Sequence, residues 1–480
     1  MSSFHHQSFR MFLAVSGTTL ALAGCATIPN LGAKPQPAQM DSFATQRSFA
    51  APAVDWVSDR WWDAYGDAQL SALIDQALSR SPSLVEAEAR MREADAQVDQ
   101  SRSALLPSAD LEGKVAETES SRAIGFPPQI SSLLPKGYNA EASLTFNAAY
   151  DLDLFGKNRA ALAAAVSEAE AQKADLAQAR LTLSTSVAQA YADFARLTAE
   201  RDAAAEAVQD RLASSKLVSD RVLNGLDTQA ELKQAEAATP TSQADVEVLD
   251  EQILIARHRI AALVGAGPDY GLELVPPPLE KVRPYGLPAD LRVNLVGRRP
   301  DIVAARLRAE AAAKQIDVAG AAFYQDISLS GYIGQQALYL QNMFTPAAAM
   351  GSLGPALSLP LFEGGRLRGA YRGARANYDA AVAAYNETLI TALQDVADAA
   401  ASVQSAQRQL DERRQAFTAG QAAYNVAELR YKGGLSSYVS VLTAEDAVIE
   451  QRRALADAET RAFTLDIALI RALGGGFNGA

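Results

Sequence analysis

The stretch Asn139–Gly156, NAEASLTFNAAYDLDLFG, alternates between apolar and polar side chains. The apolar positions are Ala140, Ala142, Leu144, Phe146, Ala148, Tyr150, Leu152 and Leu154. The other positions are mostly polar and include the acids Glu141, Asp151 and Asp153. Because successive side chains of a strand point to opposite faces, this period of two predicts one long strand over about 139–154, with an apolar face and an acidic face.

Three other segments show a weaker alternation, and each alone is as typical of a soluble sheet as of a membrane strand. They cover about 109–118, 326–336 and 350–362. No segment after residue 24 approaches the roughly eighteen apolar residues of a spanning helix, so a membrane span here would have to be a β-barrel. Because known spanning barrels begin at about eight strands, four per chain predict a barrel shared by copies, with eight strands in a dimer or twelve in a trimer.

The start of the chain has the pattern of an export signal. Arg10 precedes the apolar run Met11–Ala23, which is too short to span a bilayer and leads into LAGC, Leu22–Cys25. Small residues before a cysteine resemble the bacterial lipobox, in which the cysteine becomes the lipidated first residue of the mature chain. We therefore predict a lipoprotein signal peptide over 1–24; the alternative is an ordinary signal peptide with a chance cysteine.

Cys25 is the only cysteine of the 480 residues, so no disulfide is available and lipidation would give this thiol a purpose. Ala26 follows it, which in similar lipoproteins favours transport to the outer membrane. We predict covalent diacylglycerol and an N-acyl chain on Cys25. An extended, lipid-anchored tether over 25–60 would follow.

Composition excludes several classes of function. The formal net charge of -12 makes nucleic acid an unfavourable partner. Two of the three histidines lie in the predicted signal peptide, and the sequence has no HExxH, no G-x-S-x-G, no phosphate-binding loop and no Cys/His cluster. The acid pair Asp151 and Asp153 has no pocket signal around it. We therefore predict no catalytic residues, no metal, and no cofactor beyond the acyl chains.

The segment that begins at Arg80 resembles the segment that begins at Arg298. Four identical pairs fall at one constant spacing: Pro82 with Pro300, Gln97 with Gln315, Asp99 with Asp317, and Gly113 with Gly331. This repetition predicts two tandem copies of one structural unit, 61–283 and 284–480, joined by a proline-rich segment.

Each copy contains one very long predicted helix. Residues 157–223 include neither Gly nor Pro, and residues 366–432 include three glycines and no proline. At about 1.5 Å per residue, either helix would reach about 100 Å and would have to pack laterally as a coiled coil. The helical sequence alone does not distinguish a channel from a soluble coiled-coil rod.

Five motifs, in this order, resemble the TolC-type outer-membrane efflux proteins, in particular the lipoprotein branch typified by OprM and NodT. They are RWWDAYGDAQLSALIDQAL, RRPDI, SLPLFEGGRLRG, RYKGGLSSYVSVL and LGGGF. The resemblance extends from Cys25 to the last few residues. It implies an α+β membrane protein, a homotrimer whose shared twelve-stranded outer-membrane β-barrel continues into a long periplasmic α-helical barrel.

The resemblance also implies a function. The protein would be the passive exit duct of a tripartite multidrug efflux pump, connected by a periplasmic adapter (membrane fusion) protein to an inner-membrane RND-type pump. An alternative within the fold is the outer-membrane component of a type I protein secretion system. A rival from another class is a periplasmic coiled-coil adapter or scaffold lipoprotein. In the channel, Glu141, Asp151 and Asp153 would face water in the barrel lumen.

Two pairs of residues end the long predicted helices, Asn224 with Gly225 and Gly433 with Gly434. The neighbouring Arg221, Arg430 and Tyr431 match the tip motif that in this family meets the adapter. The alternative for these positions is a plain helix-hairpin turn capped by glycine.

Val439, Thr443 and Asp446 fall at i, i+4 and i+7, so one helix face carries all three. In related channels this face lines the periplasmic gate, often with an acid where Thr443 stands and a base where Asp446 stands. Three Asp446 carboxylates would crowd the axis of a trimer unless an arginine such as Arg430 pairs with them. The alternative is a solvated acid on the outer face of the helix.

Overall fold

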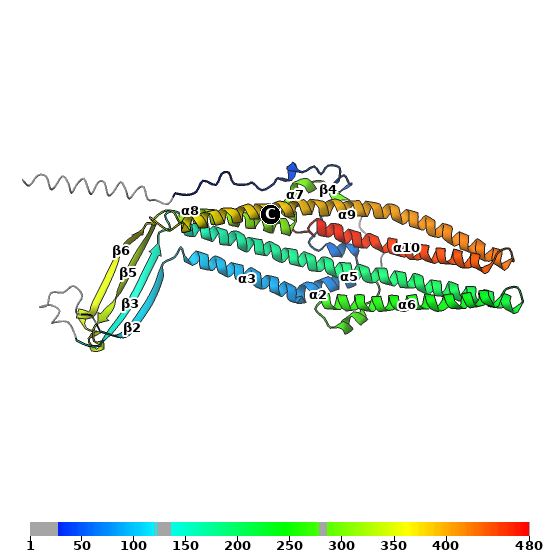
Figure 1. Cartoon of the computed structure of the whole chain (residues 1–480), viewed down its shortest axis with the longest axis horizontal. Helices are drawn as coiled ribbons and strands as arrows, with labels where there is room; N and C mark the ends of the chain where they lie inside the picture. The colour runs from blue at the N-terminus through cyan, green and yellow to red at the C-terminus, as the bar shows by residue number, and fades with distance from the viewer. Residues whose placement is uncertain (1–26, 120, 122–135, 278–285, 480) are drawn as a thin grey trace, which may run out of the picture. The chain divides into compact units, whose positions relative to one another are not determined.

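The structure is a computed structural model, and it describes residues 27–119, 121, 136–277 and 286–479. Cys25 and the predicted signal peptide lie outside the described residues. The helices and strands follow one another in an order that occurs twice, with two shorter helices, two strands, a very long helix and a returning helix (Figure 1). Two residues each of β1 (Ala53–Val54) and β4 (Leu287–Pro288) form a small parallel pair.

The first set of elements is α2 (Ala68–Arg80), α3 (Pro82–Ser103), β2 (Ser108–Thr118), β3 (Asn139–Asp151), α5 (Lys157–Leu223) and α6 (Gln229–Leu263). The second set is α7 (Leu291–Arg298), α8 (Pro300–Ala321), β5 (Asp326–Ala337), β6 (Ala349–Ser358), α9 (Arg366–Lys432) and α10 (Tyr438–Ala472). Short 3₁₀ helices occupy Met40–Ser42, Trp61–Tyr65, Pro268–Glu273, Leu340–Asn342 and Pro346–Ala348. The helices α5 and α9 have 67 residues each, and α6 and α10 have 35 each, so the sets also agree in length.

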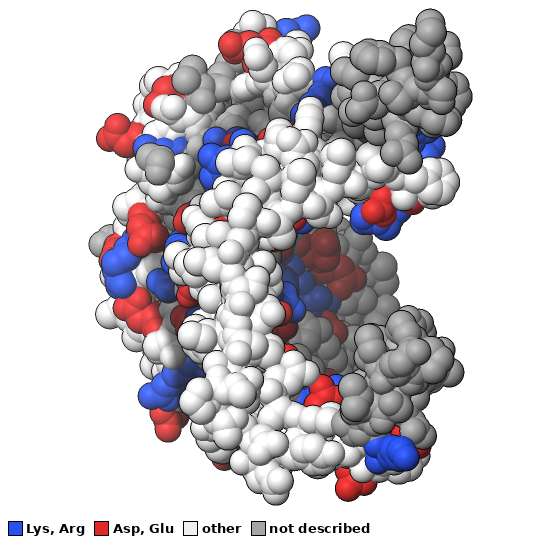
Figure 2. Space-filling view, turned by 90° about the vertical axis from the view of Figure 1, so that its left-hand side faces the viewer, with Lys and Arg blue, Asp and Glu red and all other residues white. Residues whose placement is uncertain are grey.

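Four strands form one antiparallel sheet in the order β2-β3-β5-β6. The register carries the alternation of β3 across the whole sheet, because Phe146 pairs with the apolar Leu111 and Ile333. On the other face, the Asn147 amide donates to the Asp110 carboxylate at 2.8 Å. The apolar face is exposed on the chain by itself, and uncharged side chains form a broad band on the strand side shown in Figure 2.

Two predicted strand ends are wrong by a few residues. The strand predicted over 139–154 ends at Asp151, because the following residues cap helix α5. The strand predicted over 350–362 ends at Ser358, shortly before Pro360, which has no N–H to donate to a sheet ladder. None of the described helices is both long and apolar enough to cross a membrane.

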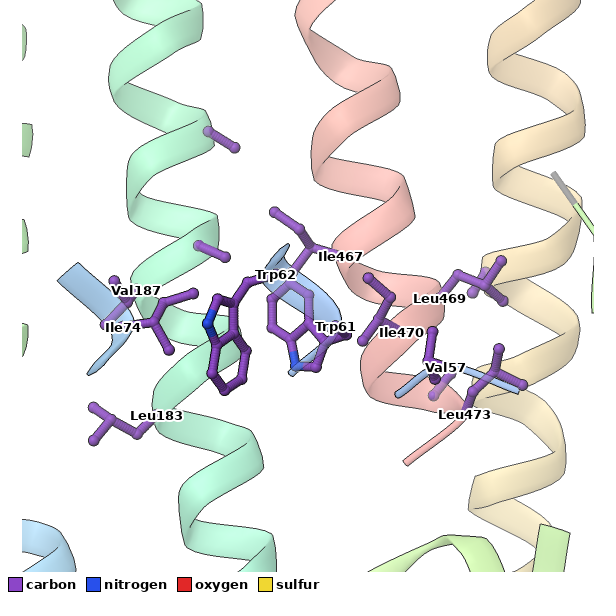
Figure 3. Packing of buried hydrophobic residues seen from close by; sticks show 14 of the residues in the cluster. Val57, Trp61, Trp62, Ile74, Leu183, Val187, Ile467, Leu469, Ile470 and Leu473 are labelled. Carbon is purple, nitrogen blue, oxygen red and sulfur yellow. The ribbon is translucent and has the colours of Figure 1, made fainter. Parts of the chain in front are cut away.

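The chain divides into two compact units. One consists of Met1–Gln36, Arg92–Glu170 and Arg306–Ala383 and contains the four-stranded sheet; the other consists of Pro37–Met91, Ala171–Ala305 and Ala384–Ala480. The second unit holds the main hydrophobic core, around Trp61 and Trp62, which pack against α5 and α10 (Figure 3). The Tyr65 hydroxyl donates to the Asp466 carboxylate at 2.6 Å inside this core. The aromatic residues of the motif RWWDAYG are thus buried packing residues, while Arg60 and Asp63 are exposed.

Candidate functional site at the helix tips

The two long helices end in the same backbone motif. In the first tip, Gly225 has a φ of 68°, its N–H donates to the Val222 carbonyl at 3.0 Å, and the Leu226 N–H donates to the Arg221 carbonyl at 2.9 Å. In the second tip, Gly434 has a φ of 74°, with bonds at 2.9 and 2.8 Å from the equivalent amides. Both are Schellman caps, which place a left-handed residue after the helix and so favour glycine.

Arg221 and Tyr431 join the two tips. The Arg221 Nε donates to Asp227 at 2.8 Å, and its guanidinium lies 4.5 Å from the centre of the Tyr431 ring. Tyr431 is fully buried, and its hydroxyl donates to the same Asp227 carboxylate. The bond to Asp227 raises the pKa of Arg221, while burial and Asp227 raise the pKa of Tyr431.

The docking prediction therefore needs correction at Arg221 and Tyr431, whose side chains are engaged in packing and hydrogen bonds within the chain. Asn224, Gly225, Arg430, Gly433 and Gly434 are exposed at the tips. Exposed leucines lie beside them and were not predicted: Leu223 at 82%, Leu226 at 62% and Leu435 at 72%. Their position directly next to the helix-ending glycines was the available signal, because residues at such turns point outward.

A buried ion pair connects α5 to α10 further along the helices. The Arg211 Nη1 lies 2.7 Å from the Glu445 Oε2, and its Nη2 contacts the Asp446 carboxylate. The Ser214 hydroxyl donates to the Glu445 Oε1 at 3.1 Å. Glu445 is 0% exposed and Arg211 is 7% exposed, so water does not screen this pair.

Burial acts on both partners of this pair. It raises the pKa of the Glu445 carboxyl above its ordinary value, although Arg211 and Ser214 act in the opposite direction. Burial also opposes the charge on Arg211, but the charges of Glu445 and Asp446 leave its pKa above its ordinary value. The nearby Tyr438 ring is buried as well, which raises its pKa to about 12. Arg211 and Glu445 were not predicted, since the i, i+4, i+7 pattern selects a different face of α10.

The three predicted gate residues lie together on one exposed face of α10. The Thr443 hydroxyl donates to the Val439 carbonyl at 2.9 Å, and the Asp446 side chain is 61% exposed. An arginine does contact Asp446, but it is Arg211; Arg430, the example named for this pairing, lies exposed.

A cleft of about 290 Å³ lies beside Asp446, between α6 and α10. Arg453 crosses it to Asp245 at 2.6 Å. On the other side of α10, Arg452 contacts Asp210 at 2.9 Å. Over residues 445–453, helix α10 is therefore attached to the α5–α6 hairpin by several ion pairs.

The three acids predicted for the barrel lumen differ in their surroundings. Glu141 is on the polar face of the sheet and accepts the Gln336 amide at 2.7 Å. Asp153 does not face open water, which corrects its prediction. It is 9% exposed, with a φ of 42°, and its carboxylate accepts the backbone N–H groups of Asn158 and Arg159 at 2.9 Å each. Asp151 accepts the Asn158 amide at 2.9 Å, so both aspartates fix the start of α5.

Within the described part of the chain, no group of three or more His, Cys, Asp and Glu side chains could hold a metal ion. The site therefore consists of helix ends, a buried ion pair and an exposed polar helix face. Such an arrangement can bind a partner and can change its packing.

The comparisons with known proteins agree on one family. The model of the family "Outer membrane efflux protein" matches residues 73–266 and 291–475. The "Fusaric acid resistance protein FusA" of Burkholderia cepacia is 36% identical over 362 residues, which are 74% of this chain and 67% of the relative. The "Multidrug resistance outer membrane protein MdtP" of Escherichia coli K12 is 29% identical over 484 residues, which are 98% of both chains.

Among solved structures, the outer membrane protein VceC from Vibrio cholerae is 41% identical, with a TM-score of 0.83. The match covers 88% of this chain and all of VceC. The resemblance inferred from the five motifs is thereby confirmed, and so is the outer membrane as its location. The chain belongs to the outer membrane efflux protein family, a family of efflux proteins and not of enzymes.

Proposed function

We propose that the protein is the passive exit duct of a tripartite efflux pump, formed by three copies of this chain. The observation that carries the proposal, together with membership of the family, is the sheet. It has four strands, and within the described residues its outer strands β2 and β6 each pair along one side only. Unpaired strand edges are unfavourable in lipid, so the sheet needs further copies to complete it.

The strand directions permit closure. Because all neighbours in the order β2-β3-β5-β6 are antiparallel, β2 and β6 run in opposite directions. The β6 edge of one copy can therefore pair antiparallel with the β2 edge of the next, as in a closed ring. Three copies give a twelve-stranded barrel, whose exposed apolar face would meet lipid and whose polar face would line the pore.

The repeated order of elements supports two tandem structural repeats, and the family model matches once in each half of the chain. Helices α5 and α9, each about 100 Å long by their 67 residues, would form the periplasmic tunnel. We assign Asn224, Gly225, Arg430, Gly433 and Gly434, with the exposed leucines at the tips, to the surface that meets a periplasmic adapter.

We assign the gate to the exposed face of α10 with Val439, Thr443 and Asp446. The Arg211–Glu445 pair would hold this face in position, because it attaches α10 to α5. Asp446 would attract cations in a narrow pore. The acyl chains proposed for Cys25 would anchor the protein in the outer membrane as an additional signal.

The names of the relatives favour small molecules as cargo, since they refer to fusaric acid and to multidrug resistance. An inner-membrane RND-type pump and an adapter are the partners that this function requires. Protein secretion uses the same fold, but no feature of the described residues favours it.

Planar-bilayer recording of the purified protein tests the proposal. We expect a cation-selective pore of small conductance, whose selectivity falls in Asp446→Asn and tends to reverse in Asp446→Arg. An oligomer that resists detergent without heating should accompany the pore. A protein that forms no pore and no such oligomer would exclude the duct, and unchanged reversal potentials in both variants would exclude the gate.

A further inference from the structure

Residues 27–39, the described residues before the first core residue Met40, lie along helix α9, although they have no regular secondary structure (Figure 1). Residues Gly32, Ala33 and Pro35 of this segment are exposed, yet their backbone carbonyls have partners on α9. An extended, proline-containing chain has no internal hydrogen bonds, so such contacts must come from elsewhere in the protein or from water.

Two α9 side chains provide these contacts. The Arg375 Nη1 donates to the Gly32 carbonyl at 3.2 Å, and its Nη2 donates to the Ala33 carbonyl. The Tyr378 hydroxyl donates to the Pro35 carbonyl at 2.9 Å. Arg375 and Tyr378 are three residues apart, so they lie on one face of the helix.

Both side chains are buried and held in place from behind. The Arg375 Nε donates to Asp379 at 2.9 Å, which fixes the guanidinium with two N–H groups toward the tether. The Tyr378 ring packs in a cluster with Ile316 and Val382, and its hydroxyl is the part that contacts the tether. An arginine is rarely buried without such partners, and here part of its hydrogen bonding is to a segment more than three hundred residues away in sequence.

We propose that Arg375 and Tyr378 form a clamp that binds the backbone of residues 32–35 and thereby shortens the free leash of the acylated N-terminus. The acyl part of this inference rests on the proposed lipid anchor at Cys25. The clamp donates hydrogen bonds to main-chain carbonyls, so it can hold the path of the tether whatever side chains the tether carries.

The clamp would limit the distance between the acyl chains and the start of α9. Arg375 is nine residues after the start of α9, about 14 Å along the helix. Gly32 is the seventh residue after Cys25, and this connection spans at most about 25 Å when fully extended. The acyl chains would therefore be held within reach of the junction between β6 and α9, where the strands of the proposed barrel leave the membrane.

The next described contact of the tether to α9 is the Ala38 N–H, which donates to the Asn386 side chain at 2.8 Å. Without the clamp, the free leash would lengthen from seven residues to thirteen. Because the effective concentration of a tethered group falls with about the −3/2 power of leash length, the acyl chains would be about 2.5-fold more dilute at the membrane surface.

Spin labels test the clamp without any lipid. In the full chain with Cys25→Ser, labels are placed at the exposed positions Lys34 and Asn377, and their distance distribution is measured by double electron–electron resonance. We expect a narrow distribution in this parent and a broad one in Arg375→Ala/Tyr378→Phe. Arg372→Ala, an exposed arginine of the same helix, is the matched control and should leave it narrow.

A broad distribution in the parent, or an unchanged narrow one in the double variant, would overturn the clamp. Tyr378→Phe alone keeps the buried ring and removes only the hydroxyl donor. It should broaden the distance distribution in part, and it serves as the test if the double variant folds poorly. An unchanged distribution in the single variant would remove Tyr378 from the clamp.

A second measurement separates the clamp from the anchor. With Cys25 intact, palmitate labelling reports acylation, and the formation of detergent-resistant oligomer is followed after a pulse of synthesis. We expect formation to be about 2.5-fold slower in the double variant than in Arg372→Ala, and equal for both in Cys25→Ser. Absent palmitate would end the anchor proposal while leaving the spin-label result intact, and equal rates with palmitate present would overturn the leash role.

Discussion

The two helical hairpins, α5–α6 and α9–α10, have the same type of backbone turn at their tips. They differ in the hydrogen bonds and ion pairs that stabilise them. When Gly225 is aligned with Gly434, the position equivalent to Arg211 is Gly420, and the position equivalent to Glu445 is Glu236. Glu236 is exposed and contacts only its neighbour Lys233, at 2.6 Å, among the ion pairs of the described residues. The Arg211–Glu445 ion pair therefore has no equivalent at the aligned positions, because glycine has no side chain to charge and Glu236 pairs within its own helix.

The starts of the returning helices differ as well. Helix α6 begins with a local bond, since the Thr228 N–H donates to the Glu231 carboxylate at 2.7 Å. Helix α10 begins at Tyr438, after Ser437, whose side chain makes no capping bond. It is attached to the other hairpin through Glu445, Arg452 and Arg453. The start of α6 is therefore stabilised by a local bond, whereas α10 depends on ion pairs to the other hairpin. Changes to those ion pairs should move α10 more than changes at its own first turn.

The largest effect should come from Glu445→Ala. It leaves the buried Arg211 with Asp446 as its remaining partner, and loss of one member of a buried pair costs about 3–5 kcal/mol. Hydrogen exchange of the α10 amides should report this loss as a lower free energy of local opening. Glu236→Ala, the equivalent change in the first hairpin, should cost less than about 0.5 kcal/mol. Equal effects of the two variants would contradict the asymmetry.

The same pair should make the second hairpin sensitive to pH. Because burial raises the pKa of Glu445 above its ordinary value of about 4.5, protonation favours the packed tip. This contribution to stability is fully present below about pH 4.5 and is lost as the pH rises through the raised pKa. Between the two pKa values, the free energy of opening should fall by about 1.4 kcal/mol for each pH unit. Hydrogen exchange of the α10 amides, corrected for the intrinsic exchange rate, should show that the free energy of opening falls with pH in the wild type. In Glu445→Gln this free energy should not change with pH. A pH dependence that persists in Glu445→Gln would assign it to another group.

Replacing the glycines of the two tips should have the same effect in both hairpins. Gly225→Ala and Gly434→Ala each force a left-handed conformation on a residue with a Cβ, at a cost of about 1–2 kcal/mol. Space is not the reason, since a Cβ at either position would meet nothing within 4 Å. Exchange at the ends of α5 and α9 should increase by the same factor. If alanine leaves the exchange rate unchanged at one tip only, the two tips do not have the same turn.

The smallest effect should distinguish the helix starts. Glu231→Ala removes the bond to the Thr228 N–H and should cost about 1 kcal/mol at the first turn of α6. Ser440→Ala, the equivalent change in α10, should stay within about 0.5 kcal/mol. If both variants open their helices equally, local capping does not distinguish the two hairpins.

Much of the fold follows from local sequence. Residues 157–223 lack Gly and Pro, and α5 occupies this range. The alternation after Asn139 likewise marks β3, because a strand exposed to different surroundings on its two faces shows a period of two. The end of β3 was missed, since Asp151 and Asp153 continue the alternation in sequence while their carboxylates bind the start of the next helix.

The site was harder to predict for the same physical reason. Arg211 and Glu445 are 234 residues apart and meet only through the packing of two hairpins, which no local pattern encodes. Tyr431 and Arg221 were placed at the right tips, but their burial depends on Asp227 and on the other hairpin. The exposed face with Val439, Thr443 and Asp446 was found because helical spacing alone defines it.

The open edges of the four-stranded sheet have a genetic consequence. In the proposed trimer each chain pairs with one neighbour through β2 and with the other through β6. One chain with a defective strand edge would therefore prevent the barrel from closing. A chain with proline in the middle of β2, expressed equally with the normal chain, would leave about one trimer in eight free of it if chains mix at random. Such an allele would be dominant, and a cell carrying both copies would be far more drug-sensitive than one that has simply lost half its protein.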